Sequence, residues 1–150
     1  MKRMLAVFVV LLTTVVFLPL FAGAQELVWD ADRIIENNYG YNGDTPKVAI
    51  SGDNAVAVWN QYDGSRNHVY SNYSTDGGAT WSSDQPIENN SYGGNYPQVA
   101  ISFNTVVAVW VQSDGENSRI YSNYSSDGGA TWENDRIIDN GSGYETECKC

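Results

Sequence analysis

The sequence predicts an all-β protein built from repeated four-stranded antiparallel sheets, and three observations lead to this prediction. Residues 46–81 recur as residues 97–132, with no gap and with identity at 23 of 36 positions. Each copy contains four short runs rich in Val, Ile, Tyr and Trp, separated by turns rich in Gly, Asp and Asn. No helical periodicity runs for a useful length after residue 24. A repeat of roughly 50 residues is typical of solenoids and propellers.

Residues 1–24 are a predicted secretory signal peptide. Lys2 and Arg3 form a basic head, an apolar run follows, and the segment ends in Ala22-Gly23-Ala24, which fits a small-residue cleavage site. The alternative is an uncleaved membrane anchor, because the apolar run approaches the roughly 18 residues that can span a bilayer. The cleavage motif favours removal after Ala24. We therefore expect a secreted or periplasmic protein with no stable membrane anchor after cleavage.

The four runs of each copy are expected to be successive strands of one sheet. In the first copy these are "PKVAIS", "NAVAVWNQ", "HVYSNYS" and "TWSSDQPIEN", which we call the inner, second, third and outer strands. The inner strands are expected to begin near Pro46 and Pro97, and the outer strands near Thr80 and Thr131. Asp-Gly pairs mark the hairpin between the second and third strands. Four strands per repeat of this length predict β-propeller blades over about 46–88 and 97–139.

The repeat region is expected to span residues 25–144. Residues 25–37 align with the outer strands of both copies and place Trp29 with their tryptophans, so one outer strand precedes two full blades. Two blades are too few to close a ring. The chain is therefore predicted to be an incomplete propeller or a homo-oligomer that completes one. Residues 145–150 form an irregular tail that contains both cysteines, so no disulfide framework is available to the sheets.

Two segments, 74–81 and 125–132, share the pattern S-x-D-x-G-x-T-W, and we call them the box segments. Their fixed positions are Ser74, Asp76, Gly78, Thr80 and Trp81, and Ser125, Asp127, Gly129, Thr131 and Trp132. The box segments resemble the Asp-box of the bacterial neuraminidase repeat, which occurs in sialidases and in other secreted β-propellers. The resemblance covers residue 25 to about residue 144. It implies that each box segment joins the third and outer strands of a propeller blade.

We expect the box segments to be structural turns. Glycine adopts backbone angles barred to other residues, while the Asp carboxylate and the Ser and Thr hydroxyls form local hydrogen bonds. The tryptophan rings are expected to be buried against the sheet. The alternative assigns Asp76 and Asp127 as catalytic carboxylates or calcium ligands. The alternation of strand direction places these turns on one rim, whereas the resemblance implies that the active site of a sialidase lies on the other. We therefore predict no catalytic residue, no metal site and no cofactor.

The loops of the other rim are the predicted ligand-binding region. They place aromatic rings beside amide, carboxylate and guanidinium groups, a combination that suits the apolar face and hydroxyl groups of a sugar. The candidate binding residues are Tyr39, Tyr41, Tyr62, Asp63, Arg66, Tyr92, Tyr96, Asp114 and Arg119. Tyr, Asn and Gly are also ordinary loop residues, so a purely structural explanation of these loops stays open.

The features that the resemblance implies for a sialidase are three substrate-binding arginines, a Tyr–Glu nucleophile pair, an Asp acid and an F/Y-R-I-P motif. The nearest match to that motif is Asp32-Arg33-Ile34-Ile35, which lacks both the proline and the aromatic residue and recurs at 135–138. His68 is the only histidine, and Arg119 occupies the equivalent position of the second copy. These departures favour a protein that is not an enzyme.

The sequence therefore predicts an exported, non-catalytic module that binds a carbohydrate or a glycoprotein. The alternatives are a truncated fragment of a sialidase-like glycoside hydrolase and a structural assembly repeat. The net charge is −10, and it would be −12 after loss of the signal peptide. Nucleic acid and anionic membrane surfaces are not expected partners, because an acidic chain repels phosphate groups.

Overall fold

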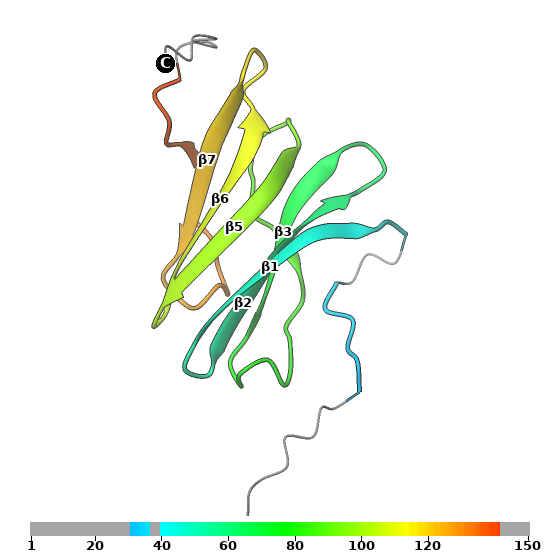
Figure 1. Ribbon diagram of the computed structural model, residues 1–150, viewed down its shortest axis with the longest axis vertical. Coiled ribbons are helices and arrows are strands. Elements are labelled where there is room, and N and C mark those ends of the chain that lie inside the picture. The colour runs from blue at the N-terminus through cyan, green and yellow to red at the C-terminus, as the bar shows by residue number, and fades with distance from the viewer. Residues whose placement is uncertain (1–30, 37–39, 142–150) are drawn as a thin grey trace, which may run out of the picture. The chain divides into compact units, whose positions relative to one another are not determined.

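The chain forms two four-stranded antiparallel sheets in the computed structural model, which describes residues 31–36 and 40–141 (Figure 1). The first sheet contains β1 (Gly43–Ser51), β2 (Asn54–Tyr62), β3 (Asn67–Ser74) and β4 (Gln85–Pro86), in that spatial order. The second contains β5 (Gly94–Ser102), β6 (Thr105–Ser113), β7 (Ser118–Ser125) and β8 (Arg136–Ile137). The described ranges contain no helix, and so none that is long and apolar enough to cross a membrane. The prediction of an all-β chain with four-stranded antiparallel sheets is confirmed.

Several predicted features lie outside the described residues. These are the signal peptide (1–24) with its cleavage site, Trp29, the candidate ligand residue Tyr39, and the tail (145–150) with both cysteines. The chain divides after Asp32, and both sheets belong to the unit that starts at Arg33.

The inner strands begin three residues earlier than expected, at Gly43 and Gly94. Gly43 and Asp44 pair with the end of β2, and the register then shifts between Asp44 and Lys47. The second sheet has the same irregularity between Asn95 and Gln98. Such a β-bulge lets a strand continue past residues that leave the ladder. The prolines that were expected to start these strands therefore lie inside the bulges.

The outer strands are much shorter than the sequence predicts. They were expected to begin near Thr80 and Thr131, but only two residues of each pair with the third strand. In the first sheet the side-chain amide of Asn72 donates to Ser82 O at 2.8 Å, while Ser82 N donates to Tyr73 O at 3.0 Å. Asn123 makes the equivalent side-chain bond to Glu133 O. An asparagine side chain thus replaces part of the regular ladder in each repeat.

The tryptophans that are fully buried are not those of the box segments. Trp81 and Trp132 are only half-buried, so the expected burial of their rings is incomplete. Trp59 on β2 and Trp110 on β6 are buried instead, and their rings stack on Tyr70 and Tyr121. These rings therefore contribute more apolar burial than those of the box segments.

The main apolar core lies between the two sheets, where β5 packs against β1, β2 and β3 (Figure 1). The buried side chains are Val56, Val58, Val69 and Ile87 from the first sheet, and Val106, Ala108, Trp110 and Tyr121 from the second. The approach is close at Gly94, where an added Cβ would lie 2.6 Å from Val69 Cγ2 and 2.8 Å from Trp110 Cδ1. Glycine at this position lets β5 approach the first sheet.

The segment before β1 contacts the first sheet as β4 contacts the second. Asn72 Nδ2 donates to Ile35 O at 2.7 Å, and Asn123 Nδ2 donates to Ile87 O at 2.9 Å. The asparagine of each third strand therefore bonds to the backbone of the preceding repeat. This parallel agrees with the alignment of residues 25–37 with the outer strands.

Each sheet leaves one face uncovered within the described part of the chain. Ile87 is 2% exposed, whereas its repeat equivalent Ile138 is 52% exposed. Val56 is fully buried, whereas Val107 is 43% exposed. On the opposite side, Val48 is exposed at a position whose equivalent in the second sheet packs against the core. The described strands thus form a stack of two sheets with open faces and not a closed ring.

Candidate functional site

The connections between strands lie at two opposite edges of the sheets, as the alternation of strand direction predicts. The box edge carries the β1–β2 and β5–β6 turns with the box segments, since Gly77 N donates to Asp53 O and Gly128 N donates to Asn104 O. The loop edge carries the β2–β3 and β6–β7 hairpins with residues 40–42 and 89–93. The candidate binding residues that the structure describes all belong to the loop edge.

The box segments form the same hydrogen bonds in both sheets. Asp76 Oδ1 accepts from Ser74 Oγ at 2.7 Å and from Thr80 N at 2.8 Å, while its Oδ2 accepts from Thr80 Oγ1 at 2.6 Å. Asp127 makes the three equivalent bonds within 0.1 Å of these lengths. Gly78 has a φ of 95°, a conformation that favours glycine. All the donors to these carboxylates come from their own turns.

These carboxylates ionise more readily than a free aspartic acid. Hydrogen bonds from Thr80 and Ser74 lower the pKa of Asp76 to about 2, and those from Thr131 and Ser125 lower the pKa of Asp127 to about 2. Ser74 and Ser125 are buried, whereas both carboxylates are exposed. Hydrogen bonding to the ionised form therefore causes the shift, and burial opposes it.

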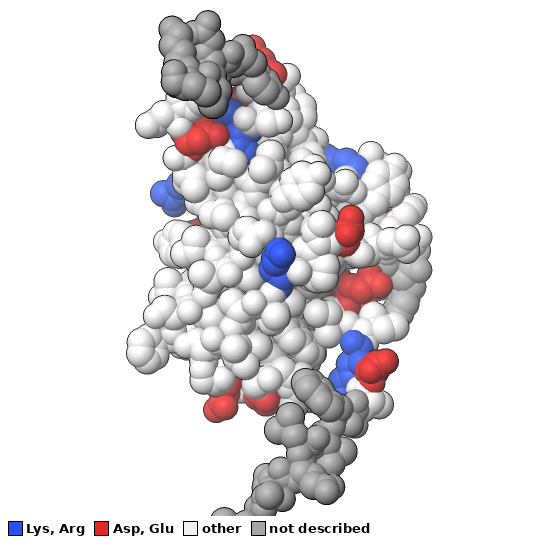
Figure 2. All heavy atoms as spheres, viewed as in Figure 1, with Lys and Arg blue, Asp and Glu red and all other residues white. Residues whose placement is uncertain are grey.

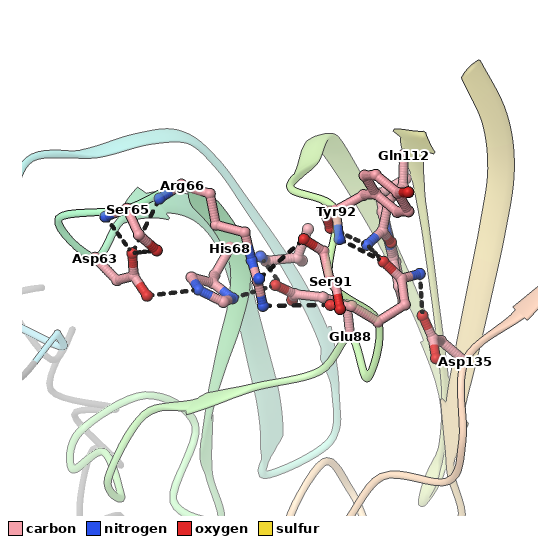
Figure 3. A network of polar contacts seen from close by, with 12 residues as sticks. Asp63, Ser65, Arg66, His68, Glu88, Ser91, Tyr92, Gln112 and Asp135 are labelled. Atoms are coloured by element: carbon pink, nitrogen blue, oxygen red, sulfur yellow. Dashed lines mark hydrogen bonds and ion pairs between the residues drawn. The ribbon is translucent and has the colours of Figure 1, made fainter. Parts of the chain in front are cut away.

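A cluster of three ionisable side chains closes the loop edge of the first sheet (Figure 3). His68 at the start of β3 contacts Glu88 through Nδ1 and lies 2.8 Å from Asp63 Oδ2 through Nε2. Glu88 also accepts a bond from Val69 N at 2.9 Å, and its burial raises its pKa. Backbone N–H groups of Arg66 and Ser65 hold the pKa of Asp63 well below its usual range. The cluster links the hairpin to the chain that follows β4.

The second sheet repeats this cluster with an arginine in place of the histidine. Arg119 Nε donates to Asp139 at 2.6 Å, and its NH1 donates to Asp114 at 3.3 Å. Asp139 also accepts from Ile120 N at 2.7 Å, as Glu88 accepts from Val69 N. An arginine stays protonated and cannot serve as a general base. The repeat therefore indicates that both clusters hold the loops in place.

The remaining polar contacts of the loop edge connect the two sheets (Figure 3). The Arg66 guanidinium donates to Ser91 O at 2.9 Å and to Asn90 O at 3.3 Å. Gln112 donates through its amide to Asn90 and to Tyr92 O, and Asn90 Nδ2 lies 3.4 Å from Asp135 Oδ2. Loop 89–93 is thus fixed to both sheets by side chains that contact its backbone.

A mostly polar pocket of about 850 Å³ opens at the loop edge between the two sheets. The described residues that line it are Glu36, Tyr41, Asn42, Gly43, Asp44, Thr45, Asn60, Asn67, Asn95 and Tyr96. The side chains from the two sheets meet at Asn95, whose Oδ1 accepts from Asn60 Nδ2 at 3.3 Å and from Asn67 Nδ2 at 3.2 Å. The pocket therefore depends on the packing of one sheet against the other.

Two pocket residues have strained backbones. Thr45 has a φ of 50° and Tyr96 a φ of 56°, a region that side chains other than glycine rarely adopt. They occupy equivalent positions within the two β-bulges. Strain of this kind costs on the order of 1–3 kcal/mol per residue and concentrates at functional sites. A bulge also redirects side chains, here toward the pocket.

Two buried oxygen atoms of the pocket residues have no hydrogen-bond partner. They are Asn60 Oδ1 and Thr45 Oγ1, and Asn60 as a whole is only 6% exposed. An unpaired buried polar atom costs roughly 1–3 kcal/mol, so most such atoms in proteins find a partner. Because both residues line the pocket, a ligand with hydroxyl groups can supply the missing donors.

Of the predicted binding residues that the structure describes, Tyr41 and Tyr96 line the pocket. The Tyr62 ring packs edge-on against the Tyr41 ring, with 5.4 Å between the ring centroids, and supports it. The other described candidates, Asp63, Arg66, Tyr92, Asp114 and Arg119, form the contacts that hold the loops.

The asparagines of the pocket were missed by the sequence interpretation. Asn60 left one signal, because it interrupts an apolar strand at a position where the second copy has Val111. A polar residue that replaces an apolar one within a repeat is a reason to examine that position. Asn95 and Asn67 left no such signal, since asparagine is common in turns.

Comparison of the sequence with models of protein families and with curated proteins found no match. Support for a function therefore comes from the residues and their geometry. Within residues 31–36 and 40–141, no group of three or more His, Cys, Asp or Glu side chains is arranged to hold a metal ion.

The lowered pKa values of the box carboxylates predict a specific loss of stability in acid. Their folded pKa of about 2 lies below the roughly 3.9 of an unfolded aspartic acid, so their contribution is present above about pH 4 and is lost as the pH falls toward 2. The double variant Asp76→Asn/Asp127→Asn should melt several degrees lower at pH 7. Its melting temperature should also fall less between pH 5 and pH 2 than that of the wild type.

Melting curves followed by circular dichroism at each pH measure both effects. Asp53→Asn is the control, because it removes a charge at the same edge without removing a box hydrogen bond, and it should change melting at pH 7 little. A double variant that melts like the wild type at pH 7 and keeps the full acid dependence would show that the box bonds do not stabilise the fold.

Proposed function

We propose that this chain is an exported β-propeller repeat protein that binds carbohydrate without cleaving it, through the loop-edge pocket. The observation that supports the proposal best is the pair of unpartnered buried oxygen atoms on Asn60 and Thr45. The propeller class rests on the repeated sheets and on the resemblance of the box segments to the Asp-box. Export rests on the predicted signal peptide.

The chemistry of the pocket suits a sugar. The unpartnered oxygen atoms can accept hydrogen bonds from sugar hydroxyls, and the asparagine amides can both donate and accept. Tyr41 and Tyr96 supply aromatic surface for the apolar face of a pyranose. The walls are largely held by contacts already made, such as those of Asn95 with Asn60 and Asn67, so little ordering is needed when a ligand binds.

The engagement of the arginines supports a non-catalytic role. In a sialidase-like enzyme, arginines would grip the carboxylate of the substrate. Here the Arg66 guanidinium donates to loop carbonyl groups and Arg119 to two aspartates, and neither lines the pocket. His68 is also engaged on both ring nitrogens. We expect no turnover of a fluorogenic sialoside by the purified protein.

Glycan binding can be tested with the variant Asn60→Val, which places at this position the residue of the second copy. The variant should fold, because Val111 occupies the same place in β6, but it removes the amide from the pocket. We expect the full chain to bind one or more neutral oligosaccharides on a glycan array. Loss of about one hydrogen bond should weaken binding roughly tenfold in titration calorimetry.

The control is Asn140→Val, the same substitution at an exposed loop residue that does not line the pocket. It should bind like the wild type. A folded protein that binds no glycan on the array would contradict the proposal, as would equal affinities for the wild type and Asn60→Val.

A second candidate, a structural assembly repeat, is favoured by the uncovered sheet faces. Ile138 and Val107 are exposed at positions whose equivalents, Ile87 and Val56, are covered by a neighbouring sheet. A further sheet, such as that of a second copy, would cover them in the same way. About three stacked repeats are usually needed for stability, because each repeat buries its apolar face against a neighbour. Two repeats alone therefore leave apolar faces exposed.

Light scattering on the secreted product distinguishes this candidate. Assembly predicts a species at least twice as heavy as one secreted chain, and Ile138→Lys should shift it toward the monomer. A wild-type monomer that is well folded and melts cooperatively would contradict it, because two sheets would then suffice for a stable core.

A further inference from the structure

We infer that the loop-edge pocket selects sugars that carry no acidic group and excludes uronic acids and sialic acids. This inference rests on the proposed function, because it names the class of sugar that the same pocket takes. It comes from the charges of the described lining residues and from the way in which the arginines are engaged.

The charged side chains among the described lining residues are two carboxylates, Glu36 and Asp44. Their hydrogen bonds come from neutral donors: Gln61 Nε2 donates to Glu36, and Thr45 N donates to Asp44 Oδ1 at 2.7 Å. Neither contact compensates the negative charge. The pocket therefore presents two carboxylates together with the unpartnered, nine-tenths buried amide oxygen of Asn60.

No basic side chain is among the described lining residues. Arg66 and Arg119 lie at the same edge, but their donors are directed to loop carbonyl groups and to Asp114 and Asp139. On the face drawn in Figure 2, basic side chains lie apart from one another among acidic and uncharged ones. An acidic sugar would thus bring a further negative charge toward Glu36 and Asp44 without meeting a cation among the described lining residues.

The size of the discrimination follows from electrostatics. Like charges brought together in a partly desolvated site weaken binding strongly, and the effect falls as salt is added. We expect an acidic sugar to bind about tenfold or more weakly than its neutral counterpart in dilute buffer. A sugar with a protonated amine should bind at least as tightly as the neutral one.

Matched sugars test this selectivity without knowledge of the natural ligand. Galactose, galacturonic acid and galactosamine share one ring configuration, as do glucose, glucuronic acid and glucosamine, and they differ in charge. Titration of the full chain with both series at low salt should rank the amine and neutral sugars above the acids. Added salt should narrow the difference.

Asp44→Asn is the informative variant, because the second copy has Asn95 at the equivalent position. It should reduce the discrimination against the acid several-fold, measured as the ratio of the affinities for the neutral and the acidic sugar. Glu36→Gln should act in the same direction. Melting temperatures near that of the wild type would establish that both variants are folded.

The outcomes distinguish a failure of the predicted selectivity from a failure of carbohydrate binding itself. Binding of neutral sugars with equal or tighter binding of the acids would overturn the selectivity and leave carbohydrate binding intact. Discrimination that survives in both variants would show that these carboxylates are not its cause and would overturn the inference. A chain that binds none of these sugars and no glycan on an array would overturn the proposed function and the inference together.

Discussion

The packing of β5 across the face of the first sheet is the interaction on which the rest of the structure depends. Fully burying a valine or isoleucine side chain contributes about 1.5–3 kcal/mol, whereas a typical hydrogen bond contributes about 1 kcal/mol. Val56, Val58, Val69 and Ile87 are all buried at this contact. Several buried apolar side chains therefore outweigh any single polar contact of the loops. The pocket also depends on this contact between the sheets, because its walls come from both sheets and meet at Asn95.

The two repeats use one backbone plan for two purposes. Where a side chain fixes a loop in both copies, the type of contact is the same even when the residue differs. Arg119, for example, lies between two carboxylates at the position that His68 occupies in the first copy. Where the copies differ in polarity, the difference points to a site. Asn60 lines the pocket, whereas Val111 occupies the same position in the second sheet. Comparison of the copies thus separates the framework from the proposed binding surface.

Much of the fold could be predicted because it follows from local patterns. Short runs rich in Val, Ile, Tyr and Trp, separated by turns rich in Gly, Asp and Asn, predicted four strands per repeat, and the structure has them in that order. The outer strands were overestimated because Asn72 and Asn123 bond to the backbone where a ladder was expected. No propensity reveals that an asparagine side chain will replace backbone pairing.

The pocket was harder to predict, because its parts come together only in the folded chain. Asn60 and Asn95 are far apart in sequence and belong to different sheets, and the strained φ of Thr45 has no sequence signature. The tyrosines and arginines were more conspicuous in the sequence, yet Arg66, Tyr92 and Arg119 hold the loops. Chemical suitability for a sugar pointed to the edge where the pocket opens, but among the described candidates it named two of the pocket residues, Tyr41 and Tyr96.

Native-state hydrogen exchange tests most directly the claim that the contact between the sheets makes them one unit. The amides of Val56 and Val58 in β2 and of Val106 and Ala108 in β6 all lie in ladder strands beside this contact. If the sheets are stable only together, these amides should exchange with the same free energy, through global unfolding. Exchange of the β6 amides through a lower-energy opening, while the β2 amides stay protected, would contradict the account.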